Sequence, residues 1–246
     1  MRRFCHLRAA SRGSNGRAAV SDAVPLHLPG SERFNETLNA ILGGAPGEWL
    51  KPALPWSVVA ENCSGEAIAL IGVRFDLTSR KGQKMSVIHL ADTLRNPEKT
   101  EFPPQTCRFF CAEAEYAAAA ARRGTDVSRR AQMNLQNLRT MLRVRASVDC
   151  IAYCDGRFEG PDTGRAFERF TRQRAAEQSL ISAVLEGKVT REDLASELNG
   201  SDSARRALAG KLLDALSAGG AEGMRERARL HRLRAALVRV ESESQD

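Results

Sequence analysis

Cysteine is the residue type whose spacing first suggests chemistry in this chain. Cys107 with Cys111 and Cys150 with Cys154 share the spacing Cys-x-x-x-Cys, and four thiols in two pairs can bind zinc. Zinc knuckles usually place two residues between paired cysteines, whereas three stand here. If both segments are strands, the members of each pair lie about 13 Å apart. The sequence leaves zinc ligation, cross-strand disulfides and free thiols open, and it favours free thiols.

Arginine is concentrated in two segments that could meet phosphate or another anionic surface. The first, residues 122–145, contains a single acid, Asp126, and the second, residues 225–239, places arginines beside an aliphatic stripe. The first segment lacks interleaved aromatic residues for stacking bases, so solvated surface is favoured over a nucleic-acid site. The second suits a membrane surface or a partner helix, but intramolecular packing is favoured. The candidate anion-binding residues are Arg122, Arg123, Arg129, Arg130, Arg229 and Arg232.

Histidine and carboxylate spacing gives no catalytic pattern. His89 is the one histidine in a segment expected to form β-structure, with Asp92 three residues later, and a lone strand histidine is usually structural. The sequence contains no nucleophile elbow, P-loop or dinucleotide fingerprint. We therefore expect no catalytic residue, no cofactor and no metal ligand, although dispersed carboxylates would leave no signature.

Composition indicates a folded, basic protein. The chain has 246 residues, 42% of them hydrophobic and 5% aromatic, and a formal net charge of +7. No window approaches the roughly eighteen consecutive apolar residues of a membrane-spanning helix. The basic N-terminus lacks the apolar core of a signal peptide, which predicts a cytoplasmic protein. A start site assigned wrongly would instead allow export.

The N-terminal part is expected to contribute little regular structure. Residues 1–30 show no periodicity and are predicted to be a disordered arm. Residues 31–53 are predicted to be a short helix and a linker. Ser31 is a suitable N-cap, Phe34 and Leu38 lie one turn apart, and Gly43 ends the periodicity.

Residues 54–159 are predicted to form a β-sandwich-like domain. Short alternating segments occur at roughly ten-residue intervals with turn residues between them, as in all-β sandwiches. An Ala- and Arg-rich insertion near 112–137 is expected to be helical or mobile. The predicted strands span residues 56–62, 67–77, 85–90, 106–111 and 142–153.

The fragment from Ala60 to Ile68 reads Ala-Glu-Asn-Cys-Ser-Gly-Glu-Ala-Ile. It resembles a strand-turn-strand element of immunoglobulin-like and fibronectin-type sandwiches, in which a polar Asn-x-Ser-Gly corner separates two core strands. The resemblance is to this class of fold and extends over about forty residues. It implies an antiparallel β-sandwich and brings no active site with it.

Residues 160–246 are predicted to be helical. Pro161 and Asp162 are expected in the first turn of a helix that Gly187 ends. Thr190 with Asp193 resembles a capping box for a short second helix. A third helix from Ser201 or Ser203 is expected to end before two glycines, and a fourth is expected over residues 221–241. The apolar stripe of this last helix comprises Met224, Ala228, Leu233, Leu237 and Val240.

The predicted fold class is therefore α+β, an antiparallel β-sandwich-like domain followed by a helical C-terminal region. The passage from Phe158 to Pro161 is too short for a flexible linker, so the two parts are expected to pack together. The leading functional hypothesis is a non-enzymatic interaction protein with an unknown protein partner. The alternative is a binder of nucleic acid or an anionic surface through residues 122–145 and 225–239, which salt dependence would distinguish.

Overall fold

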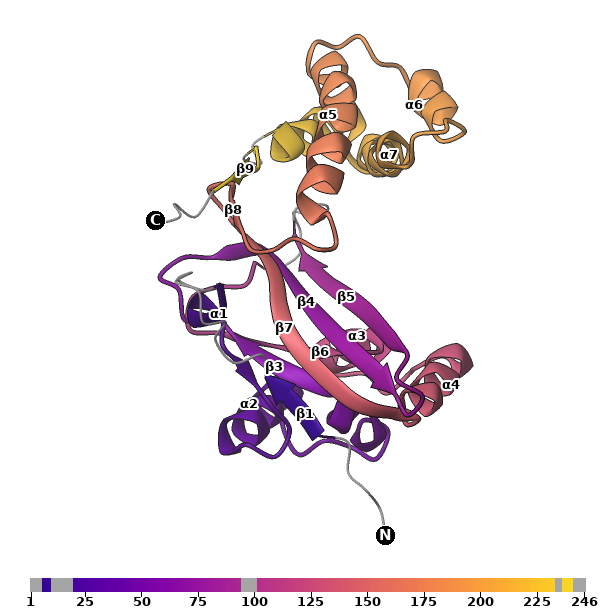
Figure 1. The fold of residues 1–246 in the computed structure, drawn as a ribbon. Helices are drawn as coiled ribbons and strands as arrows, with labels where there is room; N and C mark the ends of the chain where they lie inside the picture. Colours follow the sequence, from indigo (N-terminus) through magenta and orange to yellow (C-terminus); the bar gives the residue numbers. More distant parts are fainter. Residues whose placement is uncertain (1–5, 10–19, 94–100, 233–235, 241–246) are drawn as a thin grey trace.

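Two β-sheets and a C-terminal helical region make up this fold (Figure 1), which confirms the predicted α+β class. The computed structural model describes residues 6–9, 20–93, 101–232 and 236–240. The predicted alternation in residues 67–77 and 142–153 corresponds to the two longest strands, which pair antiparallel at the centre of the larger sheet. Alternating apolar residues on these strands account for the core on one face of that sheet.

The large sheet has the strand order β5-β4-β7-β8-β9, and β1 also pairs with β7. The β1/β7 and β8/β9 pairs are parallel, and the other pairs are antiparallel. Its strands are β1 (His6–Ala9), β4 (Ile68–Ser79), β5 (Lys84–Asp92), β7 (Met141–Tyr153), β8 (Arg157–Glu159) and β9 (Val238–Arg239).

The small sheet is antiparallel, in the order β2 (Leu26–His27), β3 (Ser57–Glu61) and β6 (Cys107–Cys111), and the 3-10 helix η1 (Lys51–Trp56) leads into β3. Both sheets contribute to one hydrophobic cluster, to which β3 supplies Val58 and the large sheet supplies Phe75. Two sheets around one core are compatible with the predicted β-sandwich-like domain. The likeness to immunoglobulin-type sandwiches stays a prediction.

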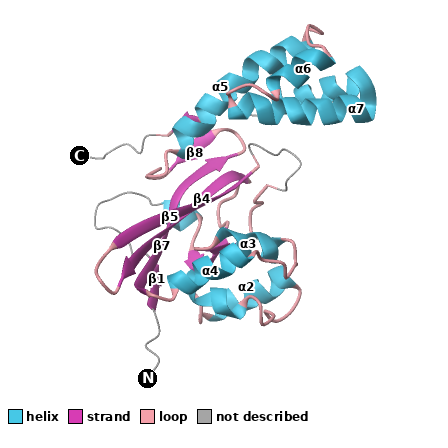
Figure 2. Ribbon diagram, turned by 90° about the vertical axis from the view of Figure 1, so that its right-hand side faces the viewer, coloured by secondary structure: helices cyan, strands magenta, loops and turns pink. Residues whose placement is uncertain are grey.

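Three helices lie on the inner side of the large sheet, on the same side as the small sheet (Figure 2). Helix α2 (Glu32–Leu42) begins where predicted, because the Ser31 side chain accepts a hydrogen bond from the Phe34 backbone N–H at 3.2 Å. It ends at Gly43, whose φ is 75°. Helices α3 (Ala114–Ala121) and α4 (Arg129–Leu138) occupy the predicted insertion, which is therefore helical over these spans.

The prediction of a disordered arm over residues 1–30 is wrong for much of its length. Strand β1 pairs with β7, α1 (Val20–Ala23) precedes a fully buried Val24, and β2 pairs with β3. These elements have two to four residues each, too few for a periodic pattern. Their hydrogen bonds come from strands far away in the sequence. The rest of the arm, residues 1–5 and 10–19, lies outside the described residues.

The C-terminal region consists of α5 (Ala166–Leu185), α6 (Arg191–Glu197) and α7 (Ser203–Arg232), which pack around a small apolar cluster of their own. Thr190 and Asp193 form the predicted capping box. Gly219 and Gly220 have non-helical backbone angles, with φ of −132° and 62°, so α7 consists of two helices joined at a kink. The third helix therefore ends before two glycines, as predicted.

Helix α5 does not begin at Pro161 as predicted. Asp162 and Arg165 have φ of 53° and 51°, so a tight loop precedes the helix, which begins at Ala166. The Asp162 carboxylate accepts hydrogen bonds from the backbone N–H of Ala166 at 2.6 Å and of Phe167 at 3.3 Å. Asp162 therefore caps α5 from outside the helix. The sequence had predicted it within the first turn.

The prediction of a last helix over residues 221–241 is wrong beyond Arg232, where α7 ends. Val238 lies in β9, and its backbone N–H donates to Gly156 O at 2.8 Å, so this segment extends the large sheet. Leu237 packs near Phe158 of β8 and does not continue a helical stripe. Leu233 lies outside the described residues. The free border of β8 supplies hydrogen-bonding partners that the sequence pattern could not show.

The helical region contacts the large sheet through one apolar cluster. Cys150 and Phe158 of the sheet pack with Ala166 and Phe170 of α5, and β9 adds backbone pairing with β8. Gly160 makes the connection possible, because a Cβ atom at this position would lie 2.6 Å from Asp149 O. These contacts agree with the expectation that the two parts are packed together.

Candidate anion-binding face

The outer face of the large sheet is covered at one end and open at the other. At the covered end, Leu70 and Cys150 pack against Phe170 of α5. Farther along β4 the outward positions become polar, because Arg74 and Asp76 alternate with buried Val73, Phe75 and Leu77. Figure 2 shows α2, α3 and α4 on one side of this sheet and none of the coloured helices on the other side along its lower half.

Strand pairing brings polar residues from three strands onto this open end. Residues opposite each other in a sheet point to the same face, and Asp76 pairs with Ser86 on one side and with Arg145 on the other. Thr78 likewise pairs with Lys84 and Arg143. We call this surface the open face; its residues are Arg74, Asp76, Thr78, Lys84, Ser86, Arg143, Arg145 and Ser147.

The one acidic residue of the open face is already engaged. Arg74 Nε donates to Asp76 Oδ1 at 2.7 Å, and Arg74 Nη2 donates to Ser86 Oγ at 3.1 Å. The Ser86 hydroxyl in turn donates to the same Asp76 oxygen. Arg74 Nη1 donates to Thr163 Oγ1 at 3.0 Å, which links the network to the loop before α5. Asp76 therefore offsets Arg74 and leaves the other cations of the face uncompensated.

Three cations on the open face carry no counter-charge. Lys84, Arg143 and Arg145 are exposed, and none of them forms an ion pair with any other residue that the structure describes. Arg143 and Arg145 stand two residues apart on β7, about 7 Å along the strand. Because the strands hold their backbones in a fixed register, the three charges form a preorganised positive surface.

The predicted anion-binding residues of the first basic segment lie elsewhere. Arg122 and Arg123 follow α3, and Arg129 and Arg130 begin α4. Both helices pack on the inner side of the sheet, so these four side chains are separated from the open face by the protein core. Arg123 also has a structural role, since its Nε donates to Ile41 O at 3.2 Å at the end of α2.

The predicted residues of the second basic segment lie on α7. Arg229 donates to Glu222 at 2.8 Å and to Glu226 at 3.2 Å, so local carboxylates offset its charge. The carbonyl oxygen of Arg232 accepts a hydrogen bond from Arg174 Nη2 at 2.9 Å. This segment is therefore less strongly positive than its sequence indicates.

None of the open-face residues was among the six candidate anion-binding residues, although Arg143 and Arg145 fall within the first basic segment. Arg74 and Lys84 lie outside both basic segments, and only the pairing of β4 and β5 brings them beside Arg143. The turn residues Lys81 and Gly82 between two alternating segments were the available signal, because a hairpin there fixes which residues face each other.

The paired cysteines do not form a common site. Cys107 and Cys111 lie on β6 of the small sheet, whereas Cys150 lies on β7 and Cys154 follows it, and all four are free thiols. Cross-strand disulfides between them are therefore absent. Burial raises the pKa of the Cys111 thiol to about 12 and strongly raises that of Cys150, so these thiols are not nucleophilic thiolates. Cys5 lies outside the described residues.

Asp149, Cys150 and Asp162 form a buried group whose ligand atoms lie within 4.8 Å of one another, the one such group in the described part of the chain. The oxygens of both carboxylates are already occupied. Asp149 accepts from the backbone N–H of Thr163 at 3.0 Å and of Gly164 at 3.2 Å, while Asp162 caps α5. Asp162 also accepts from Arg239. The group holds the loop between β8 and α5 in place, and its hydrogen bonds leave little capacity for a metal ion.

Glu61 joins the N-terminal segment to the small sheet. His27 Nε2 lies 2.7 Å from its Oε2, and Arg33 donates to both of its oxygens. The hydrogen bond from Arg33 holds the pKa of Glu61 below its usual value, although burial acts in the opposite direction. His27, expected within a disordered arm, is therefore part of an ordered ion-pair cluster.

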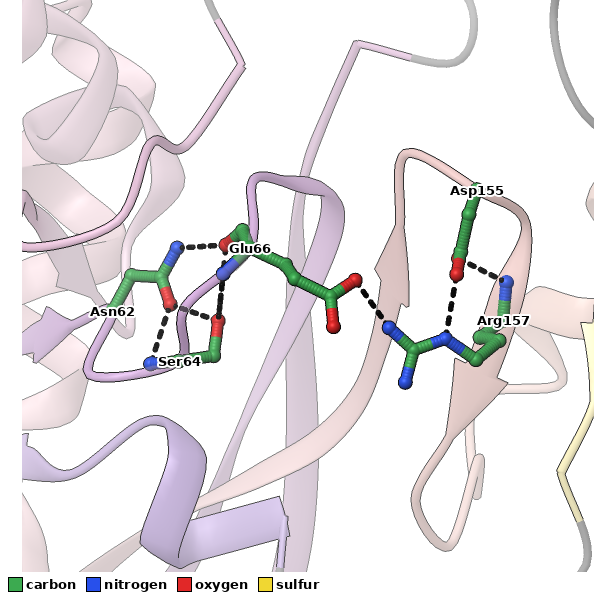
Figure 3. Close-up of polar contacts among 5 residues, drawn as sticks. All are labelled: Asn62, Ser64, Glu66, Asp155 and Arg157. Carbon is green, nitrogen blue, oxygen red and sulfur yellow. Dashed lines mark hydrogen bonds and ion pairs between the residues drawn. The ribbon is translucent and has the colours of Figure 1, made fainter.

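A second polar network joins two turns at one end of the sheets, as Figure 3 shows. The buried Asn62 side chain donates to Glu66 O at 2.9 Å and accepts from Ser64 N at 3.0 Å, which fixes the turn after β3. Glu66 pairs with Arg157, and Arg157 Nε donates to Asp155 Oδ2 at 2.6 Å in the β7–β8 turn. The Asn-x-Ser-Gly corner thus has a structural role.

His89 also has a structural environment. Its Nε2 lies 3.0 Å from Ala112 O, and its ring meets the edge of Phe75 with 6.0 Å between the ring centroids. Burial lowers the pKa of His89. These contacts agree with the structural role expected of a lone strand histidine.

Comparison with models of protein families, with curated proteins and with solved structures found no match. Among the described residues, no helix has the length and apolar character needed to cross a membrane. The open face brings three exposed cations, Lys84, Arg143 and Arg145, onto one side of the sheet.

Proposed function

We propose that this protein is a non-enzymatic binding protein whose open face contacts the phosphate backbone of nucleic acid. The observation that supports the proposal is the cluster of Lys84, Arg143 and Arg145, exposed and without counter-charges in the described part of the chain. A protein that neutralises phosphates with such cations releases condensed counterions, which supplies most of the affinity of sequence-independent binding.

The side chains suit phosphate contact. Arg143 and Arg145 carry guanidinium forks that match the geometry of phosphate oxygens, and they are held on a strand, which keeps their backbones rigid. Ser147 and Thr78 add hydroxyl groups on the same face. Hydroxyl and arginine donors are common phosphate contacts in protein–DNA interfaces.

The open face lacks an exposed aromatic ring on which an unpaired base could stack. Phe75, an aromatic residue of the strands that form the face, points into the core and is fully buried. Stacking of unpaired bases requires exposed aromatic rings, so the proposal is backbone contact with a duplex and excludes a single-strand stacking platform. Where the contacts are to phosphates alone, binding is expected to be indifferent to sequence.

The sequence-level hypothesis of a protein partner remains a second proposal, since an acidic protein surface would meet the same three cations. Competition by unrelated duplexes distinguishes a nucleic-acid partner from a protein partner. A duplex partner would be displaced by unrelated duplexes of any sequence, whereas a specific acidic protein would resist that competition.

The test is binding of a fluorescein-labelled duplex of mixed sequence, followed by anisotropy at low salt. Replacing Arg143 and Arg145 with Gln removes two of the three cations and is expected to weaken binding at least tenfold. The matched control replaces Arg129 and Arg130 with Gln, which makes the same charge change on the opposite side of the sheet. Equal losses in both variants would show that net charge alone, and not the open face, attracts the duplex.

A further inference from the structure

Strand β5 is the long free border of the large sheet. It has nine residues and pairs with β4 alone among the described strands, and Figure 1 shows it along the outer border of the sheet. The opposite border is formed by β1 and β9, which have four and two residues. Proteins usually protect exposed borders with short strands, prolines, bulges or charged side chains, and β5 carries charged side chains only at its two ends, Lys84 and Asp92. The pairing of β4 with β5 runs without a register shift, so β5 has no bulge.

The hydrogen bonds at the two ends of β5 reveal which backbone groups point outward. Ser79 N donates to Gln83 O at 2.8 Å, and Thr93 N donates to Ala69 O at 2.8 Å. In an antiparallel pair, hydrogen-bonded and non-hydrogen-bonded positions alternate. The odd-numbered residues of β5 therefore bond to β4, and the even-numbered residues direct their N–H and C=O groups away from the sheet. These residues are Lys84, Ser86, Ile88, Leu90 and Asp92.

We propose that β5 pairs antiparallel with β5 of a second copy of this chain, with Ile88 on the two-fold axis. A two-fold axis at Ile88 aligns all nine residues of the two strands and places outward backbone groups opposite outward backbone groups. An axis at Val87 or His89 would also place outward groups opposite outward groups, but it would shorten the overlap by two residues and would no longer place Lys84 opposite the partner's Asp92.

Charge complementarity supports this choice of occupant. In the proposed register Lys84 lies opposite the partner's Asp92, and by symmetry Asp92 lies opposite the partner's Lys84. Opposite charges on directly opposed residues stabilise a pair of strands, and like charges destabilise it. The apolar Ile88 meets its own copy between them. The strand is therefore self-complementary at both ends and at its centre.

Pairing through this border would also join the two open faces. Opposed residues of neighbouring strands point to the same side, so the outer faces of both copies would lie on one side of a continuous sheet. The test of the dimer uses the protein without a ligand, so it is separable from nucleic-acid binding. In the dimer Lys84 lies opposite the partner's Asp92, and Arg143 and Arg145 of each copy then supply the phosphate contacts. Failure of either proposal would therefore leave the other standing.

The first test compares two substitutions at Ser86 by sedimentation equilibrium across a range of protein concentrations. Ser86→Pro removes an outward N–H without removing a bond to β4, because proline is tolerated on a strand border whose N–H faces solvent. Ser86→Ala is the matched control, since it also loses the hydroxyl contact with Asp76 but keeps the N–H. We expect the wild type and Ser86→Ala to dimerise and Ser86→Pro to remain a monomer. A monomeric wild type, or a dimer that survives Ser86→Pro, would overturn the proposal.

The second test reverses the charges at the ends of the strand. Lys84→Glu places two carboxylates opposite each other at both ends of the pair, and it is expected to raise the dimer Kd about tenfold. Adding Asp92→Lys to that variant restores opposite charges and should restore the wild-type Kd. Lys81→Glu makes the same charge change in the adjacent turn and should leave the Kd unchanged. A double variant no better than Lys84→Glu would show that the register is different.

Discussion

Replacing Asp162 with Ala should destabilise the junction between the large sheet and the helical region. The Asp162 side chain is 2% exposed and accepts hydrogen bonds from Ala166 N, Phe167 N and Arg239 Nη2. Leaving the buried N–H of Ala166 unsatisfied costs about 1–3 kcal/mol. Alanine in the left-handed conformation that residue 162 adopts adds about 1–2 kcal/mol. Arg239 is 44% exposed and can be rehydrated, so its lost ion pair adds less than about 1 kcal/mol.

The free energy of unfolding of Asp162→Ala is therefore expected to fall by about 2–6 kcal/mol, measured by urea unfolding followed by circular dichroism. Asp162→Asn keeps the carbonyl acceptor and tolerates the left-handed conformation, so it should lose roughly half as much or less. Asp162→Gly removes the side chain but relieves the backbone strain, and it should fall between the two. A loss below about 1 kcal/mol for Asp162→Ala would refute the capping role derived from the structure.

Two further predictions concern Glu61 and the cysteines. Because Arg33 holds the pKa of Glu61 below its usual value, Glu61 contributes stability that is complete above about pH 4.3 and is lost as pH falls through the folded-state pKa. Glu61→Gln should accordingly reduce the loss of stability on acidification, measured as unfolding free energies between pH 6 and pH 3. Cys107 lies on β6 of the small sheet and Cys150 lies on β7 of the large sheet. Protein purified without chelator should therefore contain well under one zinc per chain by elemental analysis. Stoichiometric zinc lost in a Cys107→Ser, Cys150→Ser variant would contradict this placement.

The strands and caps that the sequence predicted are those that local patterns determine. Val144 and Val148 alternate with polar residues over a long segment, and the capping box at Thr190 is encoded within four residues. The strands β1, β2 and β9 were not predicted, because two to four residues cannot display a period. The start of α5 was predicted wrongly, because the left-handed backbone conformation of Asp162 depends on contacts with β7 and β9.

The candidate site was predictable only in part. Arg143 and Arg145 could be recognised as the solvent face of a strand, but their basic neighbours along the sequence lie across the core on α3 and α4. Arg74 and Lys84 join them only through strand pairing, and register is a property of the folded sheet. In this chain the basic run does not form one surface, because α3, α4 and β7 divide it between the two sides of the sheet.

The salt dependence of duplex binding tests the central claim most directly. If Lys84, Arg143 and Arg145 each neutralise one phosphate, the logarithm of the association constant should fall with the logarithm of salt concentration with a slope of about −2.7. Replacing Arg143 and Arg145 with Gln should change that slope to about −0.9, whereas replacing Arg129 and Arg130 should leave it unchanged. A wild-type slope near zero, or one that the Arg143 and Arg145 substitutions do not alter, would contradict phosphate binding by the open face.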